Sequence, residues 1–302
     1  MTLIKKTNGS EKSSESITDV KRLFSKPPKI NGSQFFRREI SSRMFEKLQI
    51  IKKNPNIILD AGCGEADDLI KFIKMYPKFT FLGVDCSEEM LKIARKKIIR
   101  YKLFNFFRKS KNNLYLSCTD FANLSVTHSS IDLIWSNLAI HWHQEPHFVI
   151  KEWSRVLKKD GVLMFCCFGP DTFSPLRAIF KKYGLEKSFI TFLDMHDYGD
   201  ILLSNGFENP VMDMEKINLT YISSEKLIND VRAFGGNLSK NRSKFLLGKK
   251  KWESILFEIE SSRKNDGLIH LDMEVIYGHA FYPQKAPTSF NESVIRLDMK
   301  YR

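Results

Sequence analysis

The chain has 302 residues, of which 42% are hydrophobic and 27% are charged, as in ordinary globular proteins. It contains no apolar run close to the roughly 20 residues of a membrane-spanning helix, and its N-terminus lacks the apolar segment of a secretory signal. Five cysteines without a CxxC pair favour neither a disulfide framework nor a zinc site, and they indicate a reducing, cytoplasmic environment.

The formal net charge of +13 favours acidic partners such as nucleic acid, an anionic membrane or an acidic protein. Biased codon usage would also enrich lysine, so charge alone names no partner. The basic residues are nonetheless clustered, because no acidic residue lies between Glu89 and Asp120. The two clusters are Lys92, Arg95, Lys96, Lys97, Arg100, Lys102, Arg108, Lys109 and Lys111, and then Lys240, Arg242, Lys244, Lys249, Lys250 and Lys251.

The chain begins with a polar stretch, residues 1–20, that we expect to be a disordered tail. An N-terminal lid or helical segment follows over 21–55, with apolar residues at helical spacing over 35–51. Short apolar runs then predict strands at 56–59, 79–84, 113–117, 131–136 and 161–168. Helices are predicted between them at 66–75, from Ser87 onward, and at 146–157.

This alternation of apolar strands and helices over 56–168 is typical of a parallel sheet covered on both faces. After Gly169 the pattern loosens. Helices are predicted at 174–183, 196–203, 224–234 and 252–262, and extended segments at 210–221 and 268–282. We therefore expect an α/β fold with a seven-strand, mostly parallel, Rossmann-like sheet. Residues 169–283 would form a helical substrate cover and the last, antiparallel strands, before a tail over 284–302.

The turn after the first strand reads Asp60-Ala-Gly62-Cys-Gly64 and lets the backbone approach a ligand closely. Dinucleotide binders use G-x-G-x-x-G here, but Gly64 is followed by Glu-Ala-Asp. A carboxylate directly before the turn would repel a pyrophosphate. It would suit the ammonium and sulfonium groups of S-adenosylmethionine.

Acidic residues also end the second and third strands. Asp85 is placed to accept both ribose hydroxyls, and Asp120 with Phe121 to hold the adenine amino group and ring. The carboxyl ends of parallel strands meet along one crevice, where such sheets bind ligands. The predicted cofactor-binding residues are Asp60, Gly62, Gly64, Asp85, Cys86, Met90, Asp120, Phe121 and Asn137.

The segment from Ile58 to Asp85 resembles the cofactor-binding half of class I S-adenosylmethionine-dependent methyltransferases, with Ala66 replacing the usual third glycine. Over about 35–283 the chain is similar to the malonyl-acyl-carrier-protein O-methyltransferases of biotin synthesis. The segments that carry this likeness are 132–142, 168–172 with Leu176-Arg177, 195–200, 210–214, 219–221, 233–237 and 275–281. One departure is that residues 24–31 lack the tyrosine of the family's N-terminal lid.

The resemblance implies an enzyme that esterifies the free carboxylate of malonyl-acyl-carrier protein, with an acidic carrier as partner and no metal. A carboxylate is already ionised at neutral pH, so no catalytic base is required. A cation is needed to recognise it, and Arg177 is our candidate. The alternatives for Arg177 are a solvated helix face or an ion pair with Asp171. His141, Trp142 and His143 are predicted to line the substrate pocket, since no third metal ligand has suitable spacing.

Other functions remain open at this point. A divergent relative would act on another carboxylate or, like the complex I assembly factors that share much of this pattern, hydroxylate a protein arginine. A non-catalytic binder would retain only the cofactor fold. Nucleic-acid methylation is disfavoured, because the run after Asn137 lacks the prolines and aromatic ring that clamp a base. We hypothesise that the basic residues 92–111 steer an acidic carrier protein.

Overall fold

The computed structural model of the protein describes residues 20, 21, 24, 34–76, 78–104, 112–234 and 248–283. Five predicted features lie wholly or mostly outside these residues: the N-terminal tail, the lid segment after Phe24, the basic residues 108–111, the basic residues 240–244 and the C-terminal tail over 284–302. Within the described part, no helix is long and apolar enough to cross a membrane.

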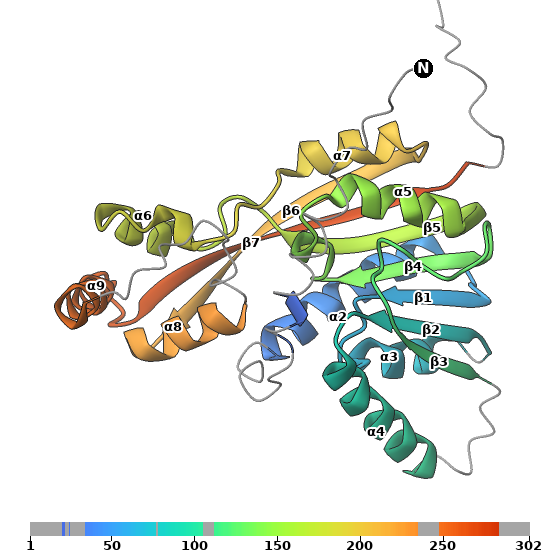
Figure 1. Ribbon diagram of the computed structural model, residues 1–302, viewed down its shortest axis with the longest axis horizontal. Coiled ribbons are helices and arrows are strands. Elements are labelled where there is room, and N and C mark those ends of the chain that lie inside the picture. The colour runs from blue at the N-terminus through green and yellow to red at the C-terminus, as the bar shows by residue number, and fades with distance from the viewer. Residues whose placement is uncertain are drawn as a thin grey trace, which may run out of the picture.

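One seven-stranded sheet runs through the molecule in the order β3-β2-β1-β4-β5-β7-β6 (Figure 1). The first five strands pair in parallel, whereas β7 is antiparallel to both β5 and β6, as predicted. The strands are β1 Ile57–Ala61, β2 Thr80–Asp85, β3 Asn113–Cys118, β4 Ile131–Asn137, β5 Leu157–Phe168, β6 Glu208–Tyr221 and β7 Ile269–Phe281.

The sequence placed the start of β5 too late, at Gly161. In the structure the strand begins at Leu157, which pairs with Ile131 before an irregularity in the register. Helix α5 therefore ends at Val156, one residue earlier than expected. The polar stretch Lys158-Lys159-Asp160 resembles a turn in sequence, but in the structure it is part of β5, which pairs with β4 from Leu157 onward.

The helices lie where the periodicity predicted them, to within a few residues. Ser87 caps α4 as expected, because its Oγ accepts a hydrogen bond of 3.4 Å from the backbone N–H of Met90. The α-helices are α2 Gln34–Ile51, α3 Asp67–Met75, α4 Glu88–Phe104, α5 Pro146–Val156, α6 Ser174–Lys182, α7 Met195–Ser204, α8 Ser224–Ala233 and α9 Lys249–Ser261, and the short 3-10 helices are η3 Ile140–Trp142 and η4 Glu186–Ser188.

Two apolar cores cover the two faces of the sheet. Side chains of α2, α3, α6, α8 and α9 belong to one core, and those of α5 and α7 to the other. Figure 1 shows that α6, α8 and α9 gather around the far ends of the long strands β6 and β7, beyond the parallel strands. This arrangement leaves the carboxyl ends of β1, β2 and β4 open between α2 and α8, and the site forms there.

Candidate functional site

The turn after β1 is pressed against the chain that follows β4. Gly62 has a φ of +83°, and a Cβ atom built on it would lie 2.3 Å from the Cβ of Ala139. The N–H groups of Gly62 and Cys63 both donate to the carbonyl of Val84, at 2.9 and 3.0 Å. Only glycine meets both the backbone angle and the close approach, so this residue is required by the geometry.

A cavity opens beside this turn, and most of the predicted site residues line it. Lining it are Asp60, Gly62, Gly64, Asp85, Cys86, Met90, Phe121, Asn137, His141 and Trp142. Asp120, His143 and Arg177 do not appear among its lining residues. The structure thus brings the ends of β1, β2 and β4 into one cavity. Of the three strand-end acids that the sequence predicted there, Asp60 and Asp85 line it, whereas Asp120 after β3 is not among its lining residues.

Asp60 ends β1 with a buried carboxylate that faces this cavity. Among the described residues, no side chain or backbone group donates a hydrogen bond to it. Burial raises the pKa of Asp60 well above its usual value, and the nearby carboxylates of Asp68 and Asp85 raise it further. An unpartnered buried acid is strongly unfavourable alone, so it favours a cationic ligand. The ammonium and sulfonium groups of S-adenosylmethionine fit this requirement.

Asp85 ends β2 and organises the same turn. Its Oδ2 accepts 2.9 Å from the N–H of Gly64, and its Oδ1 accepts 2.8 Å from the N–H of Ser87. Burial raises the pKa of Asp85, and the two backbone hydrogen bonds oppose that rise. Each carboxylate oxygen keeps a further lone pair, so Asp85 suits the ribose diol predicted for it.

Asp68 in α3 is a buried junction between the helices and the sheet. It accepts hydrogen bonds from the hydroxyl of Ser41, from Trp135 Nε1 at 2.7 Å and from Asn137 Nδ2 at 3.2 Å. Asn137 also donates to the carbonyl of Arg37 at 3.3 Å. The predicted cofactor residue Asn137 therefore lines the cavity, while its side-chain amide holds α2 against β4.

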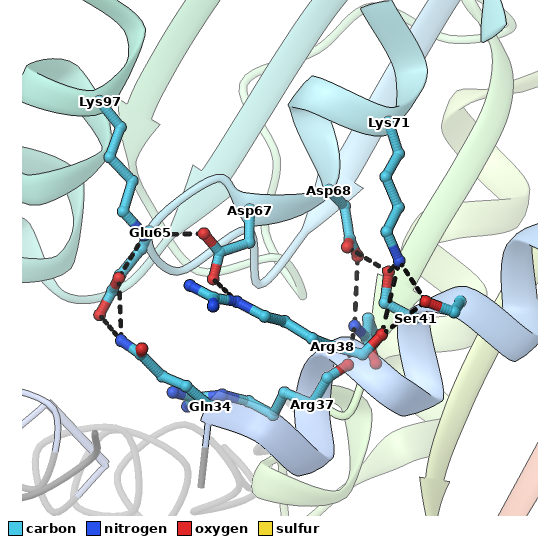
Figure 2. Close-up of polar contacts among 11 residues, drawn as sticks. Gln34, Arg37, Arg38, Ser41, Glu65, Asp67, Asp68, Lys71 and Lys97 are labelled. Atoms are coloured by element: carbon cyan, nitrogen blue, oxygen red, sulfur yellow. Dashed lines mark hydrogen bonds and ion pairs between the residues drawn. The ribbon is translucent and has the colours of Figure 1, made fainter. Parts of the chain in front are cut away.

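Ion pairs close the rim of the cavity above the turn (Figure 2). Lys97 of α4 pairs with Glu65 and, at 2.7 Å, with Asp67. Gln34 donates to Glu65 from the other side at 3.2 Å, and Arg38 lies 3.7 Å from Asp67. These contacts tie α2 and α4 to the segment that follows the glycine turn.

Neither ring nitrogen of His141 has a hydrogen-bond partner within the described part of the chain. Its ring packs 4.7 Å from that of Phe168 and 5.5 Å from that of Phe192, and it is 8% exposed. Burial lowers the pKa of His141 to about 3. The imidazole therefore stays neutral near pH 7 and offers one donor and one acceptor to a ligand in the cavity.

Trp142 connects the cavity wall to the N-terminal segment. Its Nε1 donates 3.2 Å to the carbonyl of Leu138, and its ring meets Phe24 edge-on at 5.4 Å. Phe24 also lines the cavity, and its carbonyl accepts a hydrogen bond from Ser87 Oγ. The start of the predicted lid thus contacts the site, although residues 25–33 lie outside the described chain.

Asp120 and His143 are held by local backbone contacts. Asp120 accepts from the N–H of Ala122 at 2.9 Å, and His143 accepts from the N–H of Glu145 at 3.1 Å. The His143 ring lies 6.3 Å from that of Phe121, which does line the cavity. Their predicted roles toward adenine and substrate stay predictions.

Arg177 in α6 ties together two backbone segments. Its Nε donates 2.8 Å to the carbonyl of Thr172, and its Nη2 donates 2.6 Å to that of Ile190. The alternative ion pair with Asp171 is wrong for the described residues, because the guanidinium donates to these carbonyls and makes no hydrogen bond or ion pair with Asp171, which pairs with Lys216 at 2.6 Å. Burial lowers the pKa of Arg177.

Sequence reasoning missed four charged residues at the site, namely Arg37 of α2, Glu65 of the turn before α3, and Asp67 and Asp68 of α3. Asp68 falls on the same helical face as the buried Leu69 and Phe72, which could have marked it. Arg37 stands between the apolar Phe36 and a second arginine, Arg38, and nothing in this local pattern marks it as a site residue. Among the described residues, no group of three histidine, cysteine or acidic side chains could hold a metal ion.

Comparison with known proteins agrees with this geometry. The family described as "Methyltransferase domain" matches residues 59–165. A malonyl-[acyl-carrier protein] O-methyltransferase of Gallionella capsiferriformans is 34% identical over 274 residues, which cover 90% of this chain and 92% of that protein. Proteins of the same name from Methylovorus sp. and Laribacter hongkongensis are each 35% identical, with coverage of 83–84% of either chain.

Solved structures share the fold at low sequence identity. The YcgJ protein of Bacillus subtilis matches with a TM-score of 0.56 at 14% identity, over 80% of this chain and 98% of that one. A putative methyltransferase from Bacillus halodurans matches with a TM-score of 0.55 at 17% identity, over 80% and 99%. These similarities establish a Rossmann-like methyltransferase fold.

Proposed function

The chain belongs to the malonyl-[acyl-carrier protein] O-methyltransferase family, and we propose that it methylates the free carboxylate of malonyl-acyl-carrier protein. The observation that carries the cofactor half of this proposal is the cavity at the carboxyl edge of the sheet, where the unpartnered acid Asp60 adjoins the glycine turn. The assignment of the acyl substrate rests on the similarity to relatives named malonyl-[acyl-carrier protein] O-methyltransferase.

S-adenosylmethionine supplies an electrophilic methyl group on a sulfonium. A malonyl carboxylate oxygen forms the new C–O bond while the C–S bond breaks, and the bonding pair stays on sulfur. An anion and a cation become two neutral groups, so no proton moves and no side chain must act as a base. The protein's task is therefore to align the partners and exclude water.

The walls of the cavity suit a reaction that removes charge. Phe121, Leu138, Trp142, Phe168 and Phe234 supply much of the lining. A low-dielectric surrounding disfavours the separated charges of the reactants more than the less charged transition state. Apolar walls therefore favour transfer once both reactants are bound.

Arg177 is the proposed source of positive charge for the malonyl carboxylate. Its guanidinium lies 5.7 Å from the centre of the Phe192 ring, and Phe192 in turn contacts His141 in the cavity wall. Among the described residues, no carboxylate pairs with Arg177. Two of its five N–H groups donate to the carbonyls of Thr172 and Ile190, and within the described ranges the other three have no acceptor. The neutral imidazole of His141, which lines the same cavity as Asp60, is the proposed second donor to the malonyl carboxylate.

Helix α4 is the proposed docking surface for the acidic carrier. Its basic residues Lys92, Lys96 and Arg100 are exposed, and Lys97 pairs with Glu65 and Asp67 at the cavity rim. The positive face therefore begins beside the site that the tethered malonyl group must enter. Such complementarity raises the rate of encounter.

The docking proposal is tested by reversing charge at Lys96 and Arg100. Lys97 is spared, because its reversal would also disturb the rim. We expect Lys96→Glu with Arg100→Glu to raise the KM for malonyl-carrier protein several-fold and to leave the KM for a small malonyl thioester unchanged. The matched control reverses Lys74 and Lys78, which are exposed near the other end of the sheet. Equal effects of the two double variants would contradict the proposal.

The reaction itself is tested by transfer of a labelled methyl group from S-adenosylmethionine to malonyl-carrier protein, with succinyl- and acetyl-carrier proteins as controls. Malonyl-selective transfer that Arg177→Ala abolishes and Arg177→Lys partly retains supports both the substrate and the anchor. Transfer to none of the three carriers, despite measurable cofactor binding, would instead favour a divergent relative with another substrate.

A further inference from the structure

Arg37 brings a positive charge into the cavity that sequence reasoning did not predict. It lies near the start of α2, is half-buried and lines the same cavity as Asp60. Burial lowers the pKa of its guanidinium, and the carboxylates of Glu65, Asp67 and Asp85 raise it. The guanidinium of Arg37 therefore interacts electrostatically with carboxylates at and near the turn that follows β1.

Two of these acidic neighbours are already bound to other cations. Lys97 pairs with both Glu65 and Asp67, and Arg38 also lies close to Asp67. Figure 2 shows these partners around the rim, with Arg37 below them on α2. The rim acids are thus neutralised without Arg37.

The third neighbour is occupied as well. Asp85 accepts from the backbone N–H groups of Gly64 and Ser87. The backbone carbonyl of Arg37 accepts from Asn137, but in the part of the chain that the structure describes no acceptor binds its guanidinium. A half-buried guanidinium carries five N–H donors that require acceptors, so this one is poised for an anionic ligand.

Asp60 is the opposite case in the same cavity. Its carboxylate is buried and has no donor among the described residues, while Arg37 has a guanidinium without an acceptor. A cavity that holds one unpaired carboxylate and one unpaired guanidinium is complementary to a zwitterion. The amino-acid end of S-adenosylmethionine carries an ammonium and a carboxylate on one carbon atom.

We propose that Arg37 binds the α-carboxylate of S-adenosylmethionine while Asp60 receives its ammonium group. The inference rests on the proposed function only in taking S-adenosylmethionine as the methyl donor. The malonyl carboxylate has the same chemistry, but the electrostatic neighbours of Arg37 are the residues of the cofactor turn, which favours the cofactor. Arg177 and His141 remain for the substrate carboxylate.

The test measures ligand binding to the full chain by calorimetry. The two ligands are S-adenosylhomocysteine and its decarboxylated analogue, which keeps the adenosine and the amine. Charge-assisted hydrogen bonds predict that the wild type prefers S-adenosylhomocysteine by about 10- to 100-fold. In Arg37→Met this preference should disappear. The variant should bind S-adenosylhomocysteine about 10- to 100-fold more weakly than the wild type does, whereas its affinity for the decarboxylated analogue should hardly change. Arg37→Lys should retain part of the preference.

Lys47→Met is the matched control, since Lys47 is a cation on the same helix that pairs with Asp213 at 2.6 Å and is not among the described residues that line the cavity. It should preserve the preference for S-adenosylhomocysteine. A preference that survives in Arg37→Met overturns the inference, even if both ligands bind more weakly. The inference is also overturned if Arg37→Met binds both cofactor analogues as the wild type does but has a raised KM for malonyl-carrier protein. That result would place Arg37 at the substrate carboxylate. A wild type that binds neither ligand would overturn the proposed function together with the inference.

Discussion

The indole Nε1 of Trp135 donates a hydrogen bond of 2.7 Å to Oδ2 of Asp68, and both side chains are buried. This bond joins the central strand β4 to α3, the helix that follows the glycine turn. Asp68 also accepts from Ser41 of α2. One carboxylate thus holds two helices at the orientation that the cavity needs.

Loss of the Asp68 carboxylate should therefore weaken the whole fold. Asp68→Ala leaves the N–H of Trp135 and the amide of Asn137 without their acceptor, so we expect a loss of about 3 kcal/mol in the free energy of unfolding. The neighbouring Asp67→Ala, which breaks only partly exposed ion pairs, should lose less than about 1 kcal/mol. Denaturant titration distinguishes the two. Similar losses of unfolding free energy in the two variants would show that the buried hydrogen bonds of Asp68 do not hold the helices to the sheet.

A methyl group at position 62 should disrupt both the turn and cofactor binding. In Gly62→Ala the new Cβ would overlap Ala139, in addition to the strain of a φ of +83°. Gly206→Ala is the control, since its φ is +81° and no atom lies within 4 Å of the added Cβ. We expect Gly206→Ala to lower the free energy of unfolding by about 1 kcal/mol. Gly62→Ala should lower the free energy of unfolding by more than Gly206→Ala does. It should also bind S-adenosylhomocysteine roughly tenfold more weakly or worse. Equal losses of stability and unchanged binding would contradict the close approach.

Asp60→Asn should stabilise the ligand-free protein while it weakens cofactor binding. The pKa of Asp60 is raised in the folded protein from its ordinary value of 3.8, so the folded state holds a proton that the unfolded state releases. Wild-type stability should then fall as pH rises from about 4 up to the folded pKa, and the variant should lack this loss. Unfolding free energies of both proteins between pH 4 and 9 test this. A variant that is less stable than wild type at pH 8 would contradict it.

His141 should destabilise the folded protein in acid. Its pKa falls from 6.5 to about 3 on burial, so below pH 6.5 the unfolded state binds a proton that the folded state does not. Wild-type stability should therefore decline as pH falls from about 6.5 toward 3, and His141→Phe should remove that part of the decline. Thermal unfolding at pH 7.5 and pH 5 provides the measurement. Identical pH dependence in both proteins would show that His141 takes up a proton in the folded state.

The wild-type rate of methyl transfer should show no inflection near pH 6.5 from this histidine. Its role as a neutral donor should appear instead as a loss of rate in His141→Phe that is constant across pH 6–8. The pH profile of kcat/KM for both proteins checks this. A loss confined to the acidic side would require a protonated imidazole.

Several features of the protein follow from the sequence alone, because local patterns encode them. Apolar runs predicted the strands β1 to β5, although the start of β5 was placed too late, and the extended segments 210–221 and 268–282 correspond to β6 and β7. Helical spacing predicted the α-helices from α2 to α9. Asp60 and Asp85 were found because a parallel sheet brings the carboxyl ends of its strands to one edge. Gly62 was found because a tight turn after a strand needs a residue without a side chain.

Only the tertiary structure decided which side chains share the cavity from outside the strands. Arg37 comes before the first strand, and its place in the same cavity as Asp60 depends on how α2 packs against β4 through Asn137 and Asp68. The same limit applies to Arg177, whose position after β5 was evident but whose guanidinium turned to backbone carbonyls rather than to Asp171. Periodicity fixes which face a residue occupies on its own helix. The neighbour that this face meets is set by long-range packing, which no local pattern records.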